Sequence, residues 1–232
     1  AIDSVPLTAI AFFMLTGELM TSATITDRLV ALSRALIGRI RGGLAQVNVL
    51  VSMFFAGMNG SVVADTATVG ALVLPAMKKA GYPAAFSAAV TGVSSTIGGI
   101  IPPSIMMIVL ANATEISIAA LFAAGIIPGI LIGVVIMVIN HYFAVKYNFE
   151  RSDEPFSVRR AGKELYRSSF ALLIPLVLVG SVMGGVASVV EAGAITALVA
   201  LFTGVFVYRT IKWKDCTGAF RRAFRNSAMV FI

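Results

Sequence analysis

Charge is scarce in this chain of 232 residues. Only 12% of the residues are Asp, Glu, Lys or Arg, about half the roughly 25% of an ordinary soluble domain. Charged side chains are missing altogether from three long stretches, residues 80–114, 116–145 and 168–190. Because a helix that crosses a bilayer needs about 20 apolar residues, the composition argues against a soluble globule. It indicates an all-α polytopic membrane protein.

Cysteine and histidine are almost absent as well. The single cysteine, Cys216, excludes an internal disulfide framework and a Cys-rich zinc or iron–sulfur centre. The single histidine, His141, leaves little for catalysis, and no metalloprotease, nucleophile-elbow or phosphate-loop motif is present. We therefore expect neither an enzyme nor a cofactor. The missing phosphate loop still allows a membrane subunit that a separate ATPase drives.

The basic residues, which give a net charge of +7, predict the topology. All 18 fall into four groups, at 28–41, 78–79, 146–167 and 209–225. One threading places all four groups on the cytoplasmic side, as the positive-inside rule requires. Its spans are Val5–Ala23, Ala84–Ala113, Ile118–Val145, Ser168–Gly185 and Val190–Tyr208. We therefore interpret the basic groups as signals of membrane topology rather than as a nucleic-acid-binding surface. This threading requires that residues 44–77 enter and leave the membrane on the same side.

Residues 44–77 are interrupted by Gly57-Met58-Asn59-Gly60-Ser61. The break leaves two apolar legs of about 15 residues, or roughly 22 Å at 1.5 Å per residue. The hydrocarbon core of a bilayer is about 30 Å thick, so each leg is too short to cross it comfortably. We expect a re-entrant helical hairpin with its tip at residues 57–61; two short spans in a crowded bundle are the alternative.

A second break lies inside the apolar segment 84–113. Its sequence, SSTIGGIIPPS at residues 94–104, combines two glycines with two prolines. Proline lacks an N–H and restricts the residue before it, whereas glycine permits unusual dihedrals. We expect a discontinuous helix, two half-helices around an unwound centre, although a simple kink would have the same residues.

Together the two breaks predict a binding site. Non-helical backbone is tolerated at membrane depth only where it is buried in protein or lines a cavity, and paired broken helices form the sites of many secondary transporters. Helix N-termini near Ser61 and Pro103 suit a carboxylate, and carbonyls near Gly57 and Thr96 suit a cation such as Na⁺. The predicted substrate site is Asn59, Gly60, Ser61, Ser95, Pro103 and Ser104. The predicted Na⁺ site is Gly57, Asn59, Ser61, Asp65, Ser94, Thr96 and Gly98.

The remaining polar features have structural interpretations. Asp65 could complement a helix N-terminus instead of binding an ion, and Glu18 and Glu191, near span ends, suit hydrogen bonding. Basic amphipathic helices are predicted at 28–41 and 213–225. The hydrophilic residues 146–167 form a predicted cytoplasmic linker.

The ordered set of motifs resembles the large membrane (permease) subunit of tripartite ATP-independent periplasmic (TRAP) transporters. The motifs are GELM at 17–20, RGGLAQVNV at 41–49, AGMNGSVVAD at 56–65, SSTIGGIIPPS at 94–104 and AGIIPG at 124–129. The resemblance covers essentially the whole chain. It departs from the family pattern at the tip Asn59-Gly60-Ser61, at Gly98-Gly99, and at residues 189–194, where the start of a helix is less clear.

The resemblance implies Na⁺-coupled import of small organic acids, such as C4-dicarboxylates or sialic acid, across the bacterial or archaeal cytoplasmic membrane. A periplasmic binding protein would deliver the substrate, and a small four-helix membrane subunit would complete the system. The family's elevator mechanism and inverted repeats imply a first repeat portion at 1–145, the linker at 146–167 and the start of a second repeat at 168–232. The second hairpin and unwound helix would lie beyond this chain, so we expect a fragment.

Two other functions fit the same residues. One is a divalent anion/Na⁺ symporter that works without a binding protein. The other is a membrane scaffold subunit that transports nothing.

Overall fold

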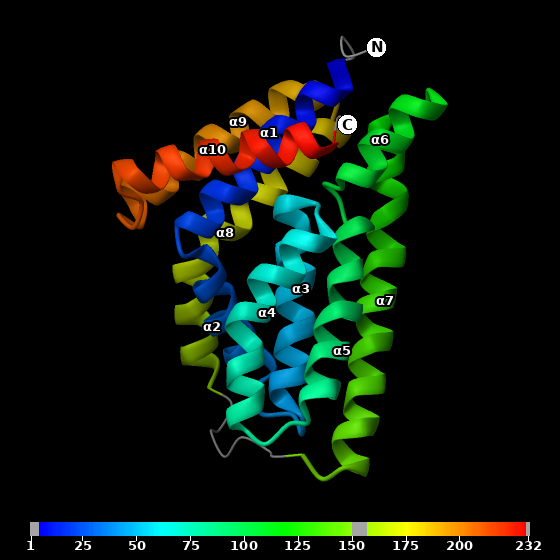
Figure 1. Cartoon of the computed structure of the whole chain (residues 1–232), viewed down its shortest axis with the longest axis vertical. Helices are drawn as coiled ribbons and strands as arrows, with labels where there is room; N and C mark the ends of the chain where they lie inside the picture. Colours follow the sequence, from blue (N-terminus) through cyan, green and yellow to red (C-terminus); the bar gives the residue numbers. More distant parts are fainter. Residues whose placement is uncertain (1–4, 150–156, 231–232) are drawn as a thin grey trace.

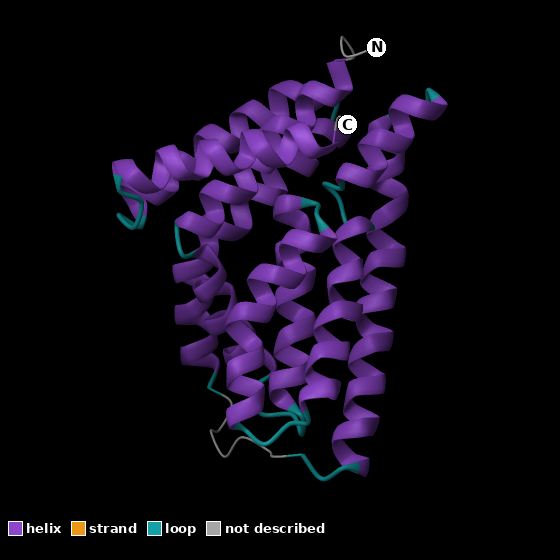
Figure 2. Cartoon of the chain, in the orientation of Figure 1, coloured by secondary structure: helices purple, strands orange, loops and turns teal. Residues whose placement is uncertain are grey.

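The computed structural model describes residues 5–149 and 157–230, and the regular structure in these ranges is helical (Figures 1 and 2). The helices are α1 (Val5–Ser22), α2 (Ile25–Ile37), α3 (Gly43–Asn59), α4 (Val62–Lys79), α5 (Ala84–Ser95), α6 (Ile105–Thr114), α7 (Ile118–Lys146), α8 (Val158–Met183), α9 (Val189–Phe202) and α10 (Trp213–Val230). A 3₁₀ turn (Thr96–Gly99) follows α5, and a π-helical turn (Thr203–Val207) extends α9.

Three of these helices are long and apolar enough to cross a membrane. They are α7, α8 and α9 with its π turn, and a fourth candidate is the pair α1 and α2, which bend by 71° at residues 23–24. The spans predicted at 118–145, 168–185 and 190–208 are thereby confirmed in length and composition. The composition and helices are those of a polytopic membrane protein, with α3 and α6 as shorter apolar helices.

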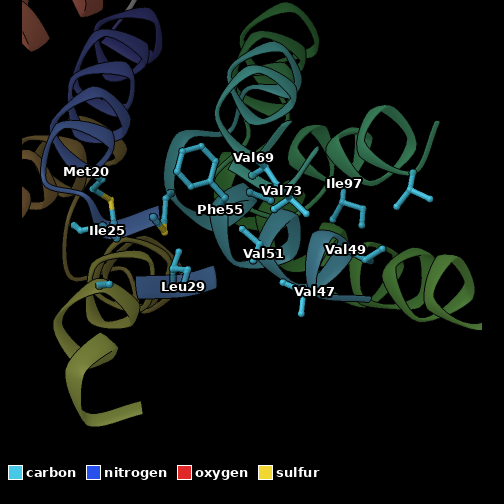
Figure 3. Packing of buried hydrophobic residues seen from close by; sticks show 14 of the residues in the cluster. Met20, Ile25, Leu29, Val47, Val49, Val51, Phe55, Val69, Val73 and Ile97 are labelled. Carbon is cyan, nitrogen blue, oxygen red and sulfur yellow. The ribbon is translucent and has the colours of Figure 1, made fainter. Parts of the chain in front are cut away.

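Helix α3 is the centre of the larger apolar core. It lies against α2, α4, α5 and α7, and most of its side chains are buried because neighbours cover it on several sides. Figure 3 shows Val51 and Phe55 of α3 beside Val69 and Val73 of α4 and Ile97 of the 3₁₀ turn. This packing holds the two helices of the predicted hairpin against the broken helix.

Helices α1, α9 and α10 form a second group of neighbours (Figure 1). A separate apolar cluster joins α1 to α6, α8 and α9 and includes Phe13, Ile108, Leu178 and Ala192. Helix α9 begins with a capping box, in which Ser188 and Glu191 each accept a hydrogen bond from the other's backbone N–H. Glu191 therefore has the structural role expected of it, and the start of this helix is well defined.

Three of the four basic groups gather at one end of the molecule. At that end α4 finishes at Lys79 and α7 at Lys146 (Figure 1). The turn before α3 lies against α7 there, since a Cβ on Gly42 would contact Ala144. The fourth group, on α10, lies elsewhere, beside α1 (Figure 1). Residues of three groups therefore reach this end, whereas Arg28 of the first group lies over the Tyr208 ring; the placement of all four groups on one side of a membrane stays a prediction.

Helix α8 takes up the second half of the predicted linker, because it begins at Val158 rather than at residue 168. Residues 150–156 of that linker lie outside the described residues. The early turns of α8 meet α2 and the end of the π turn: the Tyr208 hydroxyl donates to the Arg167 carbonyl at 3.0 Å, and the Arg28 guanidinium lies 3.8 Å over the tyrosine ring.

The two predicted amphipathic helices exist, with different surroundings. Helix α2 buries Leu29 and Leu32 but leaves Leu36 exposed. Helix α10 buries Ala219 and Ala223 against its neighbours and exposes Phe220 and Phe224. Phe220 and Phe224 thus face outward, as they would on a helix lying at a membrane surface.

Candidate functional site

The predicted hairpin tip is a tight turn between α3 and α4. Gly60 has the left-handed conformation, with φ of 58°, which costs a residue with a Cβ roughly 1–2 kcal/mol. The Asn59 side-chain oxygen accepts from the Ser61 backbone N–H at 3.1 Å. Ser61 caps α4 by accepting from the Ala64 backbone N–H at 3.4 Å. The chain therefore reverses direction within the two residues Gly60 and Ser61.

The predicted break in the segment 84–113 is confirmed. Helix α5 ends at Ser95, the 3₁₀ turn follows, and α6 begins only at Ile105. Ser104 secures the junction from both sides: its hydroxyl donates to the Gly99 carbonyl at 2.8 Å and accepts from the Met107 backbone N–H at 3.4 Å. A cis peptide bond joins Pro102 to Pro103.

The tip and the break touch through backbone atoms. The Gly60 carbonyl accepts from the Ile105 backbone N–H at 3.3 Å. A Cβ on Gly60 would collide with the Pro103 carbonyl, and a Cβ on Gly98 would lie 3.7 Å from the Ser61 carbonyl carbon. Glycine is required at residue 60 both for its backbone angle and for this close approach. The structure thus brings together the two segments from which the sequence predicts a site.

A cavity of about 470 Å³ opens beside the tip. Its walls come from α1, the tip, α4 and α10, and its size suits a small organic molecule. The lining residues are Met14, Gly17, Glu18, Thr21, Asn59, Ser61, Val63, Ala64, Ala67, Thr68 and Asn226.

The wall opposite the tip is a polar connection between α1 and α10. Glu18 accepts from Arg222 at 2.6 Å and from Asn226 at 3.1 Å, and Arg222 also donates to the Ser22 hydroxyl at 3.0 Å. At the residue before Glu18, a Cβ on Gly17 would lie only 2.6 Å from the Asn59 Cβ. Glu18 therefore has the structural hydrogen-bonding role expected of it, and Gly17 lets α1 approach the tip.

Behind the tip lies a buried polar cluster, in which Ser94 was predicted from the sequence but Asn48, Ser52 and Thr91 were not. Asn48 of α3 donates to the Thr91 hydroxyl of α5 at 2.7 Å. The Ser52 and Ser94 hydroxyls lie 3.2 Å apart, and Ser94 also reaches the Asn48 side-chain oxygen at 3.4 Å. The signal was present in the spacing, since Asn48 and Ser52 are one helical turn apart, as are Thr91 and Ser95.

Asp65 belongs to this cluster rather than to the cavity. Its side chain is 0% exposed and lies beside the Ser95 and Ser52 hydroxyls. Among the described residues, neither carboxylate oxygen has a hydrogen-bond partner. Asp65 lies in the first turn of α4, where an acid can complement the helix N-terminus, while Ser61 supplies the side-chain cap.

The residues predicted to bind substrate or Na⁺ fall into three places. Asn59 and Ser61 line the cavity. The tip–break junction holds Gly57, Gly60, Gly98, Pro103 and Ser104. The buried cluster holds Asp65, Ser94 and Ser95. Thr96 is exposed, and its hydroxyl donates to the Val93 carbonyl of its own helix at 2.7 Å.

Known proteins resemble this chain along its whole length. The large permease protein SiaM of a sialic acid TRAP transporter from Vibrio cholerae is 35% identical over 231 residues, which cover 100% of this chain and 54% of SiaM. The C4-dicarboxylate TRAP transporter large permease protein DctM from Pseudomonas aeruginosa is 37% identical over 90% of this chain and 49% of its own length. The 2,3-diketo-L-gulonate TRAP transporter large permease protein YiaN from Escherichia coli is 37% identical over 99% of this chain and 54% of its own length.

These relatives are named as transporter permeases, not as enzymes. The chain spans about half the length of the curated relatives that it matches. The model of the family described as the tripartite ATP-independent periplasmic transporter, DctM component, matches residues 1–232. The cavity beside a glycine tip and a broken helix, the apolar spans and this match lead to one conclusion: the chain belongs to the DctM family of TRAP transporter large permeases.

Proposed function

We propose that the complete protein is the large permease subunit of a Na⁺-coupled TRAP system that imports a small organic acid. A periplasmic binding protein delivers the acid, and a small four-helix membrane subunit completes the complex in the cytoplasmic membrane. Alternating access occurs by an elevator movement of the hairpin and the broken helix against the other helices.

The observation that carries the proposal is the contact between the tip and the break beside the cavity, in a chain that belongs to this family. Discontinuous helices whose ends meet supply unpaired backbone groups to an anionic substrate and its coupling ion. Asn59 and Ser61 of the tip line the cavity. The names of three relatives refer to sialic acid, C4-dicarboxylate and 2,3-diketo-L-gulonate, which are all organic acids; this supports the substrate class.

The α1–α10 connection supports a division into fixed and moving parts. Glu18, Arg222 and Asn226 bind α1 to α10 on one wall of the cavity. The opposite wall belongs to α4, which packs with α3 and α5. An elevator movement of α3–α6 past α1 and α10 would change the shape of this cavity while both groups of helices stay intact.

The test is uptake by the complete protein, reconstituted in liposomes with the small subunit. Labelled organic acids are supplied with and without an inward Na⁺ gradient, and with and without the binding protein. We expect uptake that requires both. A Ser61→Ala variant should lose most of that uptake, whereas Thr66→Ala, an exposed hydroxyl on the same helix, should keep it.

Other outcomes would support the competing functions. Uptake that does not need the binding protein would contradict the tripartite system and favour a stand-alone anion/Na⁺ symporter. Uptake that a K⁺ gradient supports equally well would contradict Na⁺ coupling. Absence of uptake for every acid in the panel, with all three components present, would favour a scaffold role.

A further inference from the structure

Asp65 is a buried acid without a counter-charge. Its carboxylate is 0% exposed, and among the described residues neither oxygen accepts a hydrogen bond. Apolar side chains surround this part of the core, including Val69 one turn later on α4 and Val51 beside Ser52 on α3 (Figure 3). An ionised carboxylate in such surroundings is unstable unless a positive group binds it.

The Ser95 hydroxyl beside Asp65 donates its hydrogen bond to another group. Ser95 donates to the Thr91 carbonyl at 2.8 Å. Thr91 donates to the Ser87 carbonyl at 2.9 Å, so its hydroxyl must accept from the Asn48 amide nitrogen at 2.7 Å. That contact fixes the orientation of Asn48 and leaves its side-chain oxygen as an acceptor.

Ser94 supplies the remaining donor. Its single proton is shared between the Asn48 side-chain oxygen, at 3.4 Å, and the Thr91 carbonyl, at 3.1 Å. The Ser52 and Ser94 hydroxyls lie 3.2 Å apart, and either of them can donate to the other. When Ser94 gives its proton to Asn48 or to the Thr91 carbonyl, Ser52 donates to Ser94, and the Ser52 and Ser95 hydroxyls then have lone pairs, not protons, free for a cation beside Asp65, because each hydroxyl has one proton to give.

We propose that a Na⁺ ion binds between α3, α4 and α5, held by the Asp65 carboxylate and by the free lone pairs of the Ser52 and Ser95 hydroxyls. These groups offer four oxygens, the ligand type that hard cations prefer. This inference rests on the Na⁺ coupling proposed above and places an ion site behind the tip rather than at it.

A monovalent ion suits the site better than a divalent one. Asp65 is the only charged side chain that the described contacts bring to the site, and one carboxylate neutralises one positive charge. Among the described residues, no group of three or more Asp, Glu, His or Cys side chains could hold a metal ion. The site residues come from α3, α4 and α5, so a bound ion would hold α4 to both α3 and α5.

The experiment measures Na⁺ binding separately from transport. The purified complete protein, in detergent, is heated in NaCl or in choline chloride at constant ionic strength, and the Tm is followed as Na⁺ is titrated. A ligand that binds only the folded state raises the Tm with its concentration. We expect a saturable rise for the wild type.

Three variants and two controls locate the ion. Asp65→Asn should abolish the Na⁺-dependent rise or move its midpoint at least tenfold, and Ser52→Ala and Ser95→Ala should each move it several-fold. Asp27→Asn and Ser169→Ala change exposed residues of the same types and should keep the wild-type midpoint. Because each midpoint is read against the same variant in choline, a change in basal stability does not affect the comparison.

Two results would overturn the proposal. One is an Asp65→Asn variant whose Na⁺ midpoint lies within twofold of the wild type; if that variant does not fold, the same result for both serine variants has equal weight. The other is a wild-type Tm that does not respond to Na⁺. If liposome uptake still requires Na⁺ in either case, the coupling stands and only this location of the ion fails.

Discussion

Gly60 shows how one residue joins two segments that are 40 residues apart in the sequence. Its left-handed backbone turns α3 into α4, and its missing side chain lets the Pro103 carbonyl approach. A Gly60→Ala change should lower the free energy of unfolding by about 1–2 kcal/mol for the backbone conformation alone, with a further loss from the collision. Thermal unfolding of the purified complete protein measures the effect.

The matched control for that change is Gly92→Ala in α5, where a Cβ would meet nothing within 4 Å. Alanine is the better helix former by up to about 1 kcal/mol, so this variant should be no less stable than the wild type. Equal losses for Gly60→Ala and Gly92→Ala would show that the tip does not need a glycine.

Asn48 connects α3 to α5 with a side chain that solvent does not reach. Asn48→Ala removes the hydrogen bond to Thr91 and leaves Ser94 without one of its acceptors. The expected loss is about 1–3 kcal/mol, measured by chemical unfolding. Asn112→Ala, at an exposed position of α6, should change stability far less; comparable losses would mean that the buried cluster contributes little.

At the scale of single residues, the sequence predicted where the helices break better than it predicted which polar side chains are buried. Glycines and prolines mark both breaks because few other residues tolerate such backbone angles. Nothing local distinguishes Ser95, turned inward with Asp65, from Thr96, which is exposed. That difference depends on which neighbouring helix covers each face of α5, and helix placement is a tertiary property.

Helices were predicted more reliably than their ends, because long apolar runs and Gly/Pro breaks are local signals. The early start of α8 is the main difference: charged residues before 168 suggested a linker, yet Arg159 and Lys163 simply occupy exposed positions on a continuing helix. The 71° bend between α1 and α2 could not be predicted from the sequence either, because it depends on how α2 packs on α3 and α8.

Small residues along α7 allow another helix to approach closely. A Cβ on Gly133 would collide with the Met53 side chain of α3, and one on Gly129 with Ile101. Gly133→Leu should therefore cost about 1–3 kcal/mol or more by overpacking. The amount of monodisperse protein after extraction and its Tm measure the effect.

A similar glycine pair on α8 provides the control. Gly180 and Gly184 have the same spacing, but a Cβ on Gly180 would meet nothing within 4 Å. Gly180→Leu should thus be tolerated. If Gly180→Leu and Gly133→Leu proved equally harmful, the close contact between α7 and α3 would not be what limits the size of residue 133.

For the whole molecule, the strongest inference from sequence is the topology. The ends of α4 and α7 carry Lys79 and Lys146 at one end of the structure, whereas the turn between α6 and α7, with Glu115, lies at the opposite end (Figure 1). The positive-inside rule predicts that Lys79 and Lys146 lie on the cytoplasmic side. The position of α10 beside α1 was not predictable, because amphipathicity tells which face is apolar and not which neighbour will cover it.

Labelling of single cysteines tests this arrangement in cells. In a Cys216→Ser background of the complete protein, cysteines replace Lys79, Lys146 or Glu115, all of which are exposed. A maleimide that cannot cross membranes should react with Glu115→Cys in intact spheroplasts and with the other two only in inverted vesicles. A fourth cysteine at the exposed Arg39, which precedes the hairpin, tests re-entry: if α3 and α4 return to the side from which they enter, Arg39→Cys shares its side with Lys79→Cys. Reaction of these two from opposite sides would mean instead that the segment between them, which holds α3 and α4, crosses the membrane an odd number of times.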